Sequence, residues 1–366
     1  MTSGIFVGRL YDALTPYLSV CVVAPDSNED ISVRSGVVAF RYALKRHQRL
    51  AHLPGGIPVQ LKKNPILYFY VPLFLASYLY TTFCESKGKD IILANWAVSG
   101  LIGAIVKIVT RKALITVLRG DDVKFNGKKG FLLSIAIKHS DSVVVVSEEM
   151  CNYLKKMYPS SKNKMITILN GVDKSFSSIA GRKKFLSFIF VGSLIKRKNI
   201  DYIINEMATW KNLDFEFHII GDGDMRIQLQ NRVKELELSK QIQFYGEISP
   251  EKINKFFSGA TFYISASLHE GRPNAVVEAI AAGCIPILSN ISGHRELIGN
   301  LSSQLLFSQE SQGSLSHCVE SLLIDKNNID EIKEKITTLK NTQLYSWDKC
   351  ATHYVELINN VCEKVK

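Results

Sequence analysis

Short apolar runs alternate with amphipathic segments along most of the chain, a pattern that predicts strands separated by helices. The clearest example is an apolar run over Thr261–Ser267, a helical segment over Ala275–Ala282 that Gly283 ends, and a second apolar run over Cys284–Ser289. Two strands joined through a helix are expected to run parallel with a right-handed crossover. In such sheets ligands bind at the carboxyl ends of strands, beside helix N-termini. Glu270 and the start of the helix are expected at such a place.

The same rhythm of strands and helices occurs in both halves of the chain. Strands are predicted at residues 18–24, 90–95, 113–118, 142–147 and 165–169 in the first half, and at 185–191, 214–220 and 241–245 in the second. A polar segment at residues 174–184 interrupts the pattern. The chain is therefore expected to form two doubly wound α/β domains, which its length of 366 residues also suggests.

The beginning of the chain departs from this rhythm. Helical spacing over residues 5–17 comes before the first strand, and no strand precedes Gly4. We therefore expect the first domain to lack its N-terminal strand. Residues 33–49 carry five basic side chains and are predicted to be helical.

Residues 65–84 form a run of 20 uncharged residues with seven aromatic side chains. This length could cross a bilayer, but Pro72 and several polar side chains interrupt the run. Three interpretations stay open: a core helix, a helix lying in the plane of a membrane surface, and a membrane span.

Composition narrows the class of protein. The hydrophobic content of 46% and the charged content of 22% are ordinary for a globular protein. The seven cysteines are scattered without a C-x-x-C pair, which argues against a disulfide framework or a zinc site and fits a reducing cytosol. The first 18 residues lack the basic start and apolar run of a signal peptide.

The net charge of +11 comes from the first half of the chain. Residues 1–180 contain 23 Lys and Arg against 12 Asp and Glu, whereas residues 181–366 contain 22 of each. A one-sided basic domain suggests an anionic partner. The candidates are nucleic acid, an anionic membrane face and a phosphorylated acceptor, besides a solvated surface that binds nothing.

Two groups of residues could together bind a nucleotide sugar. The cations Lys196–Lys198 lie in a predicted strand-to-helix turn, where they suit a diphosphate. Glu270 and Glu278, placed around a helix start, could accept hydrogen bonds from sugar hydroxyls, and the N–H groups of Asn274 and Ala275 could face phosphate oxygens. Each group alone would more often be a solvated loop or an ordinary helix surface.

Other common site motifs are absent from the sequence or weak. It contains no P-loop, no nucleophile elbow and no cluster with metal-ligand spacing. Gly221-Asp222-Gly223 resembles the start of a dinucleotide fingerprint, but the third glycine is missing. A tight turn at the sheet edge is an equally good interpretation.

With these motifs the second half resembles the donor domain of family-4 (group 1) glycosyltransferases, retaining enzymes of the GT-B fold. The matching segments are Phe190–Gly192, Lys198, Ile219–Gly223, Phe244–Gly246, Ser267–Gly271, Glu278–Ala279, Ala282–Pro286, Gly293 and Glu296. The first half matches more loosely, at Arg119–Asp122, Ser142–Glu148 and Asn170–Asp173. The resemblance implies two Rossmann-like domains facing a cleft. Residues 1–176 would bind the acceptor and receive a returning final helix at 346–366, and residues 177–345 would bind the donor.

The resemblance also implies roles for individual residues. Glu270, Lys198 and Arg119 would be catalytic: Lys198 would hold the donor diphosphate, Glu270 would contact the transferred sugar, and Arg119 stands where many members have a histidine. Glu278 would accept from the ribose hydroxyls. Where many members have an arginine this chain has Ser193, so diphosphate binding would depend on Lys198, helped by Lys196 or Arg197. The remaining donor-binding residues would be Gly4, Ser193, Arg197, Gly221, Asp222, Gly223, Tyr245, Gly246, Glu247, Gly271, Asn274 and Ala275.

The activity that this resemblance implies is sugar transfer with retention, without a metal or cofactor, from a UDP- or GDP-linked donor to a glycan or lipid-linked acceptor. Cell-surface polysaccharide or lipopolysaccharide assembly is the expected setting. The basic, aromatic first domain fits an anionic membrane surface, so we expect a cytoplasmic protein bound peripherally to the inner face of the cell membrane. Nucleic-acid binding is not expected, because no recognised module is present. The alternatives are a nucleotide-sugar epimerase of similar fold and an inert, truncated paralogue that binds nucleotide sugar.

Overall fold

The structure is a computed structural model. It describes all residues except 1–4, 27–34, 45–47, 49, 51–55, 124–129, 178–185, 211–212, 299–300, 302, 325, 345 and 366. The chain divides into a C-terminal unit, residues 171–346, and an N-terminal unit, residues 2–170 with 347–366. The sequence placed the divisions at 176/177 and 345/346. They fall at 170/171 and 346/347 because Val172 pairs with Ser346 and Phe176 is buried in the core of the C-terminal unit.

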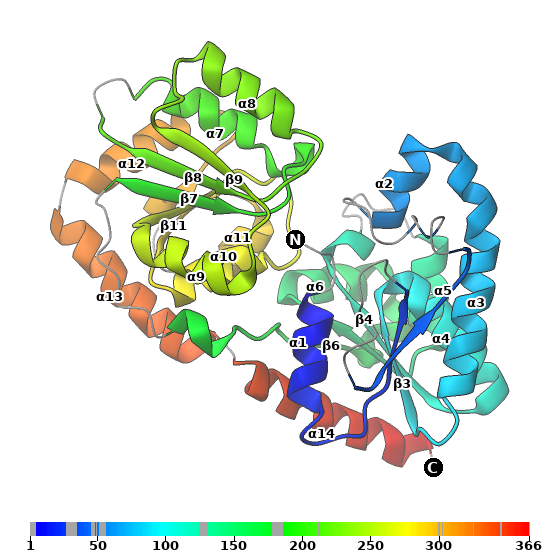
Figure 1. Cartoon of the computed structure of the whole chain (residues 1–366). Coiled ribbons are helices and arrows are strands. Elements are labelled where there is room, and N and C mark those ends of the chain that lie inside the picture. Colours follow the sequence, from blue (N-terminus) through cyan, green and yellow to red (C-terminus); the bar gives the residue numbers. More distant parts are fainter. Residues whose placement is uncertain are drawn as a thin grey trace. The chain divides into compact units, whose positions relative to one another are not determined.

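The C-terminal unit is built on a six-stranded parallel sheet of order β12-β11-β10-β7-β8-β9 (Figure 1). Its strands are β7 (Ser187–Val191), β8 (Glu216–Ile220), β9 (Ile242–Gly246), β10 (Phe262–Ser265), β11 (Ile285–Ser289) and β12 (Leu306–Phe307). Its helices are α7 (Ile200–Met207), α8 (Arg226–Glu235), α9 (Pro250–Gly259), α10 (Asn274–Ala281), α11 (Ser292–Ile298), α12 (Ser314–Ile324) and α13 (Lys326–Gln343). Short 3-10 turns are η6 (Lys174–Ser177), η7 (Lys196–Lys198) and η8 (Ser303–Leu305).

The order of the strands creates a switch point in this sheet. Strands β7, β8 and β9 are added toward one edge, and β10, β11 and β12 toward the other, so β7 and β10 are neighbours. Every residue of β7, β10 and β11 is buried, as expected for central parallel strands covered on both faces. Connections that leave in opposite directions open a crevice at the carboxyl ends of the two switch strands, which is where such sheets bind ligands.

The N-terminal unit contains a four-stranded parallel sheet of order β3-β4-β5-β6 and a separate parallel pair, β1-β2. The strands are β1 (Val22–Pro25), β2 (Val37–Phe40), β3 (Ile91–Asn95), β4 (Ala113–Leu118), β5 (Ser142–Val145) and β6 (Met165–Thr167). The helices are α1 (Ile5–Leu14), α2 (Gly56–Lys63), α3 (Tyr70–Glu85), α4 (Trp96–Thr110), α5 (Phe131–His139), α6 (Glu148–Met157) and α14 (Trp347–Val365), with 3-10 turns η3 (Pro65–Phe69), η4 (Gly120–Asp122) and η5 (Pro159–Lys164).

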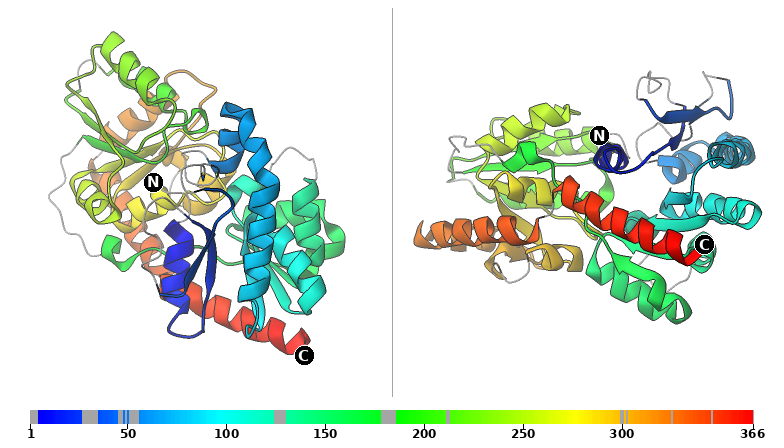
Figure 2. Two further views of the ribbon diagram at one scale, coloured as in Figure 1. Left: turned by 45° about the vertical axis from the view of Figure 1, so that its right-hand side comes forward. Right: turned by 90° about the horizontal axis from the view of Figure 1, so that it is seen from below.

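The last helix of the chain belongs to the N-terminal unit, as the sequence predicted. Helix α14 lies beside α1 (Figure 2). Leu10 and Leu14 of α1 share one buried cluster with Tyr354 and Ile358 of α14 and with Val117 of β4. This cluster covers one face of the four-stranded sheet, so residues from both ends of the chain complete a single core.

Two expectations for the beginning of the chain have different outcomes. The helix predicted over residues 33–49 is wrong, because β2 lies within this segment and pairs with β1. Phe40 of β2 packs against Phe74 and Tyr78 of α3, so tertiary packing overrides the basic helical pattern. The first described element is α1; Gly4, around which the missing strand was predicted, lies outside the described residues.

The uncharged run beginning at Pro65 forms η3 and α3, and it is not a core helix. The stretch Pro65–Glu85 is long and apolar enough to cross a membrane by length and composition, and its most apolar 18-residue window has a mean hydropathy of 1.4. Only 11% of its most apolar window is buried. Both figures show α3 on the outside of its unit, where it contacts β1, β2 and α4.

Candidate active site

Glycines at the ends of β7, β8 and β9 bring three turns together. Gly192 donates its N–H to the Ile220 carbonyl at 3.0 Å, and Gly221 donates to the Gly246 carbonyl at 2.8 Å. Gly221 has a φ of +133°, and a Cβ there would lie 1.9 Å from the Gly192 carbonyl oxygen. Only glycine fits this position, since a side chain would be both strained and in collision with backbone. The turn after β7 includes the exposed Ser193.

Asp222 and Gly223 form the turn after β8. The Asp222 carboxylate accepts from the Gly223 N–H at 2.7 Å and lies 2.6 Å from Nη1 of Arg226. The backbone hydrogen bond, with help from Arg226, holds the pKa of Asp222 below its usual value. A Cβ on Gly223 would lie 2.4 Å from the Leu194 carbonyl oxygen, so this turn packs directly on the turn after β7.

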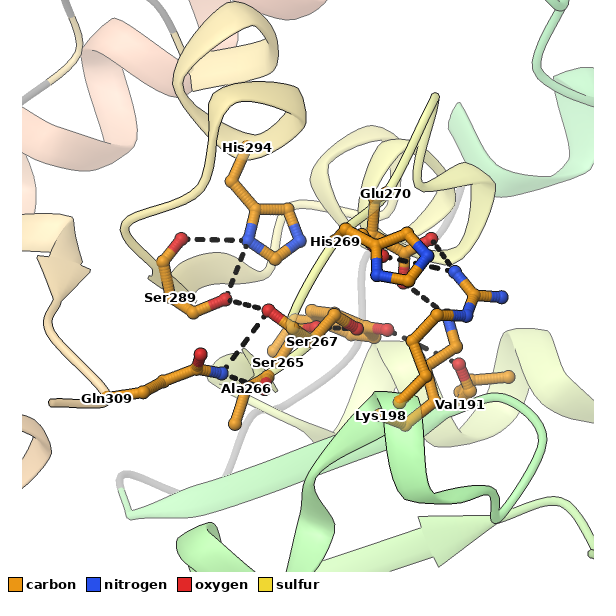
Figure 3. Close-up of polar contacts among 12 residues, drawn as sticks. Val191, Lys198, Ser265, Ala266, Ser267, His269, Glu270, Ser289, His294 and Gln309 are labelled. Atoms are coloured by element: carbon orange, nitrogen blue, oxygen red, sulfur yellow. Dashed lines mark hydrogen bonds and ion pairs between the residues drawn. The ribbon is translucent and has the colours of Figure 1, made fainter. Parts of the chain in front are cut away.

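Cations after β7 meet a carboxylate after β10 at the switch point. Nζ of Lys198 lies 2.5 Å from Oε1 of Glu270. Nη1 of Arg197 lies 3.2 Å from Oε2 of the same carboxylate and donates to the His269 carbonyl at 3.1 Å (Figure 3). The sequence proposed Lys198, Arg197 and Glu270 as separate contacts to a donor. The structure shows in addition that they bind one another.

The Glu270 carboxylate is ionised in the folded protein. Only 8% of its side chain is exposed. Burial alone would raise its pKa, but Lys198 and Arg197, together with a hydrogen bond from Ser267, lower the pKa to about 2. The cluster therefore holds two cations and one anion. A diphosphate that bound to the cations would have to compete with Glu270 for them.

A buried polar network holds the loop that follows β10 (Figure 3). Ser289 donates to the Ser267 carbonyl at 2.7 Å, and Gln309 donates to the same carbonyl at 3.2 Å. His294 lies behind Ser289, with Nδ1 2.9 Å from its carbonyl oxygen. Because β12, β11 and β10 are adjacent, residues after three strands fix one loop. Neither His294 nor Gln309 was singled out from the sequence, because no motif marks either residue.

His294 is a neutral, fully buried histidine. It has no exposed surface, and burial is the main cause that lowers its pKa to about 4. Since a carbonyl only accepts hydrogen bonds, the contact with Ser289 assigns the proton to Nδ1. Next to it, a Cβ on Gly293 would lie 2.4 Å from the Glu270 carbonyl oxygen and 3.4 Å from that of Gly271, so helix α11 packs closely on the loop.

Lowering the pH from about 6.5 to about 4 is expected to destabilise the C-terminal unit through His294 by roughly 3 kcal/mol. The unfolded ring binds a proton near its ordinary value of 6.5, whereas the folded ring binds one only near 4. The stability is therefore complete above the unfolded pKa and is lost as the pH falls. His294→Asn, whose amide can still donate to the Ser289 carbonyl, should lose this pH dependence. Urea unfolding of the full chain at both pH values tests it, and an unchanged dependence in the variant contradicts it.

Helix α10 begins directly after the Glu270 loop. The helix, expected from Ala275, begins one residue earlier at Asn274, and Pro273 occupies the N-cap position without a side-chain hydrogen bond. The N–H groups of Asn274 and Ala275 are in the first turn, where no carbonyl within the helix accepts from them. Glu278, one turn further, is 8% exposed.

Glu278 and Glu270 lie near the same buried ring, that of Tyr263 on β10. Burial raises the pKa of the Tyr263 phenol, and the charges of Glu270 and Glu278 raise it further. Its hydroxyl donates to the Val191 carbonyl at the end of β7. The two glutamates singled out from the sequence are thus placed around the switch strands.

Tyr245, expected among the donor-binding residues, is turned toward helix α9. Its ring lies 4.7 Å from that of Phe256, and its hydroxyl donates to Gln243 at 2.6 Å. It is therefore the Gly246 backbone, rather than the Tyr245 ring, that contacts the glycine turns. Glu247 follows at the strand end and is exposed.

Arg119 lies in the N-terminal unit as a buried cation without a carboxylate in ion-pair distance among the described residues. Its guanidinium donates to Oδ1 of Asn95 at 2.9 Å and to Oδ1 of Asn170 at 2.8 Å, and lies 4.1 Å from the centre of the Phe6 ring. Burial lowers its pKa. Arg119 therefore joins the carboxyl ends of β3 and β4 to the segment after β6. Gly4 lies outside the described residues, and within the described part of the chain no three His, Cys, Asp or Glu side chains converge as metal ligands would.

Comparison with known proteins agrees with this geometry. Residues 172–340 match the family model described as glycosyl transferases group 1. The matched part of the C-terminal unit belongs to that family, and the protein is a glycosyltransferase.

Three relatives illustrate the match. An uncharacterized glycosyltransferase of Methanocaldococcus jannaschii is 28% identical over 73% of this chain and 74% of its own length. The Campylobacter jejuni N-acetylgalactosamine-N,N'-diacetylbacillosaminyl-diphospho-undecaprenol 4-alpha-N-acetylgalactosaminyltransferase is 25% identical over 78% of this chain and 80% of its own. The O-antigen chain mannosyltransferase RfbU of Salmonella typhimurium is 26% identical over 58% of this chain and 57% of its own.

Solved structures share the fold over nearly the whole chain. Sucrose-phosphate synthase from Thermosynechococcus elongatus superposes with a TM-score of 0.76 at 17% identity, covering 98% of this chain and 93% of that one. HepE from Anabaena, in complex with UDP and glucose, gives 0.69 at 15% identity and covers 98% of both chains. The expected fold, two Rossmann-like domains of the GT-B class, is confirmed.

Proposed function

We propose that this glycosyltransferase moves a sugar, with retention of configuration, from a UDP- or GDP-linked donor to a lipid-linked glycan acceptor in the assembly of cell-surface polysaccharide or lipopolysaccharide. The observation that carries the proposal is the cluster of Lys198, Arg197 and Glu270 at the switch point. Two half-buried cations suit a diphosphate, and a buried ionised carboxylate suits the hydroxyls of the attached sugar.

The names of the relatives support this acceptor class. The Campylobacter relative is named for transfer onto a diphospho-undecaprenol-linked sugar, and the Salmonella relative for the O-antigen chain. HepE was solved with UDP and glucose, which supports a uridine donor in particular. We place the protein in the cytoplasm, peripherally on the inner face of the cell membrane, where lipid-linked acceptors and nucleotide sugars meet.

In the proposed reaction the bond between the sugar C1 and the diphosphate oxygen breaks, and a bond between C1 and the acceptor oxygen forms on the same face. The acceptor proton passes to an oxygen of the leaving diphosphate. Lys198, Arg197 and the first-turn N–H groups of α10 stabilise the developing negative charge. Glu270 orients the sugar, and Glu278 accepts from the ribose hydroxyls. Arg119 remains a proposed catalytic residue of the N-terminal unit, and the chemistry needs no metal or cofactor.

Lys198→Met is expected to weaken nucleotide-sugar binding by roughly 100-fold or more, because it removes a half-buried cation from the diphosphate. Calorimetric titration with UDP- and GDP-sugars measures the change, after a thermal-shift panel has identified the base. Of the two helpers that the resemblance offered, Arg197 reaches Glu270, whereas Lys196 belongs to the same turn but is exposed, so Lys196→Met is the matched control. Equal affinities for both variants and the wild type would remove Lys198 from the site.

Product analysis separates the proposal from its alternatives. Incubation of the identified donor with diphospho-undecaprenol-linked sugars should give an extended lipid product and free nucleoside diphosphate. Release of an isomerised sugar without acceptor would identify an epimerase. Tight donor binding with neither transfer nor hydrolysis across a full acceptor panel would identify an inert sugar-nucleotide-binding protein.

A further inference from the structure

The outer side of η3 and α3 is an exposed surface without charges. Phe69, Pro72, Leu73, Ala76 and Tyr80 are all exposed and follow one another at helical spacing; we call them the α3 stripe. Three of them are large: Phe69 is 81% exposed, Tyr80 71% and Leu73 54%. Ile66 and Tyr68 of η3 extend the stripe at its N-terminal end, at 68% and 57%. A contiguous row of this kind marks an interaction surface on a soluble domain.

The opposite side of α3 is firmly attached to the N-terminal unit. The Phe74 ring, 6% exposed, lies 5.2 Å from both Phe40 and Tyr42. Tyr78 stacks on Phe40 at 4.9 Å, and its hydroxyl lies 2.9 Å from Oγ of Ser99 on α4. A helix that crossed a bilayer would have to give up all these contacts. The packing therefore favours a helix that stays on its unit and offers only one face.

We infer that the α3 stripe binds the surface of an anionic bilayer, with the helix lying in the membrane plane. Its aromatic side chains are those that prefer the boundary between headgroups and acyl chains. Exposed lysines, Lys63 and Lys87, flank it at both ends, and no carboxylate occurs between residues 64 and 84. The excess of 23 basic over 12 acidic residues in the first half of the chain complements anionic lipid. The inference rests on the proposed function in one respect, that a lipid-linked acceptor requires access to the membrane.

The test is flotation of the full-length protein with vesicles containing phosphatidylglycerol. Wild type should float with the vesicles, and the variant Phe69→Ser/Leu73→Ser/Tyr80→Ser should bind at least tenfold more weakly. The matched control is Ile227→Ser/Ile324→Ser, which removes two side chains of similar exposure, 73% and 85%, from the C-terminal unit. Because all five side chains are exposed, thermal unfolding should be unchanged in both variants. Wild type that does not float, or a stripe variant that floats as wild type does, overturns the inference.

Two further measurements test the alternatives to surface binding, which are a membrane span and contact with a second copy of the chain. Alkaline carbonate should release the wild-type protein from vesicles, and retention after carbonate would show a span instead. If the stripe instead binds a second copy, analytical ultracentrifugation will show a dimer that the stripe variant dissociates, without vesicle binding.

Failure of this inference and failure of the proposed function give different results. The stripe variant should keep wild-type donor affinity and should transfer sugar to a water-soluble, short-chain acceptor. If the protein binds vesicles but no nucleotide sugar, the membrane-binding role of the α3 stripe stands and the proposed function is wrong. If the protein transfers sugar to soluble acceptors but never floats with vesicles, the proposed activity stands and the membrane inference is wrong.

Discussion

Glu270→Gln is expected to reduce sugar transfer by roughly 1000-fold while tightening the binding of free nucleoside diphosphate by about tenfold. Glutamine keeps the size of the side chain but removes the anion that pairs with Lys198 at 2.5 Å and with Arg197 at 3.2 Å. The two cations then lack a counter-charge, which the diphosphate supplies. The transferred sugar loses its carboxylate contact, so turnover falls. Opposite effects on nucleotide affinity and on turnover are the signature of this site.

Calorimetry with the nucleoside diphosphate and a transfer assay measure the two effects separately. Glu235→Gln, which removes an exposed carboxylate from α8, is the control and should change neither. An independent reading comes from acid unfolding. The folded pKa of Glu270 is about 2 against an ordinary 4.5, so its stabilisation is complete above about pH 4.5 and is lost as the pH falls toward 2. If Glu270→Gln binds the nucleotide more weakly and unfolds in acid as the wild type does, the pairing of Glu270 with Lys198 and Arg197 is contradicted.

Gly221→Ala is expected to destabilise the C-terminal unit by roughly 3–5 kcal/mol, the sum of backbone strain and overpacking. The methyl group would lie 1.9 Å from the Gly192 carbonyl oxygen at a φ of +133° that alanine rarely adopts. The turns after β7, β8 and β9 would have to separate, so donor binding should be lost together with stability. Urea unfolding of the full chain measures the first effect and thermal shift with nucleotide sugar the second.

Gly259→Ala is the matched control for the same substitution. Gly259 ends helix α9, and a Cβ there would have no neighbour within 4 Å. Alanine should leave stability unchanged or raise it by up to about 1 kcal/mol, because it restricts the unfolded chain and favours helix. If both variants unfold at the wild-type urea concentration, the close approach of the glycine turns is not rigid.

The sequence predicted the doubly wound fold because its central strands are continuous apolar runs, such as β7 and β11, separated by amphipathic helices. It also singled out Lys198 and Glu270, since a basic turn and an acidic loop each follow such a run. It could not show that they pair. That contact depends on β7 and β10 being neighbours in the sheet, although 72 residues separate Lys198 from Glu270.

Other features have no local signal at all. His294 and Gln309 support the Glu270 loop only because β11 and β12 lie beside β10, and a buried neutral histidine has no pattern of its own. Strand β2 was mistaken for part of a helix because its four residues lie in a basic segment, and its packing partners on α3 come more than 30 residues later. In each case, contacts between residues far apart in the sequence determine the structure, and the local sequence pattern cannot predict them.

The return of α14 to the N-terminal unit has a consequence for the order of events during synthesis on the ribosome. Residues 171–346 are contiguous, so the C-terminal unit can fold as soon as they have emerged. The N-terminal unit is made first but cannot complete its core at that stage. Leu10 and Leu14 pack with Tyr354 and Ile358 of α14, which is synthesised last. Domains usually finish folding in the order in which they are synthesised. Here the N-terminal unit finishes after the C-terminal unit. In the nascent first half the apolar face of α1 therefore stays uncovered until α14 has been synthesised.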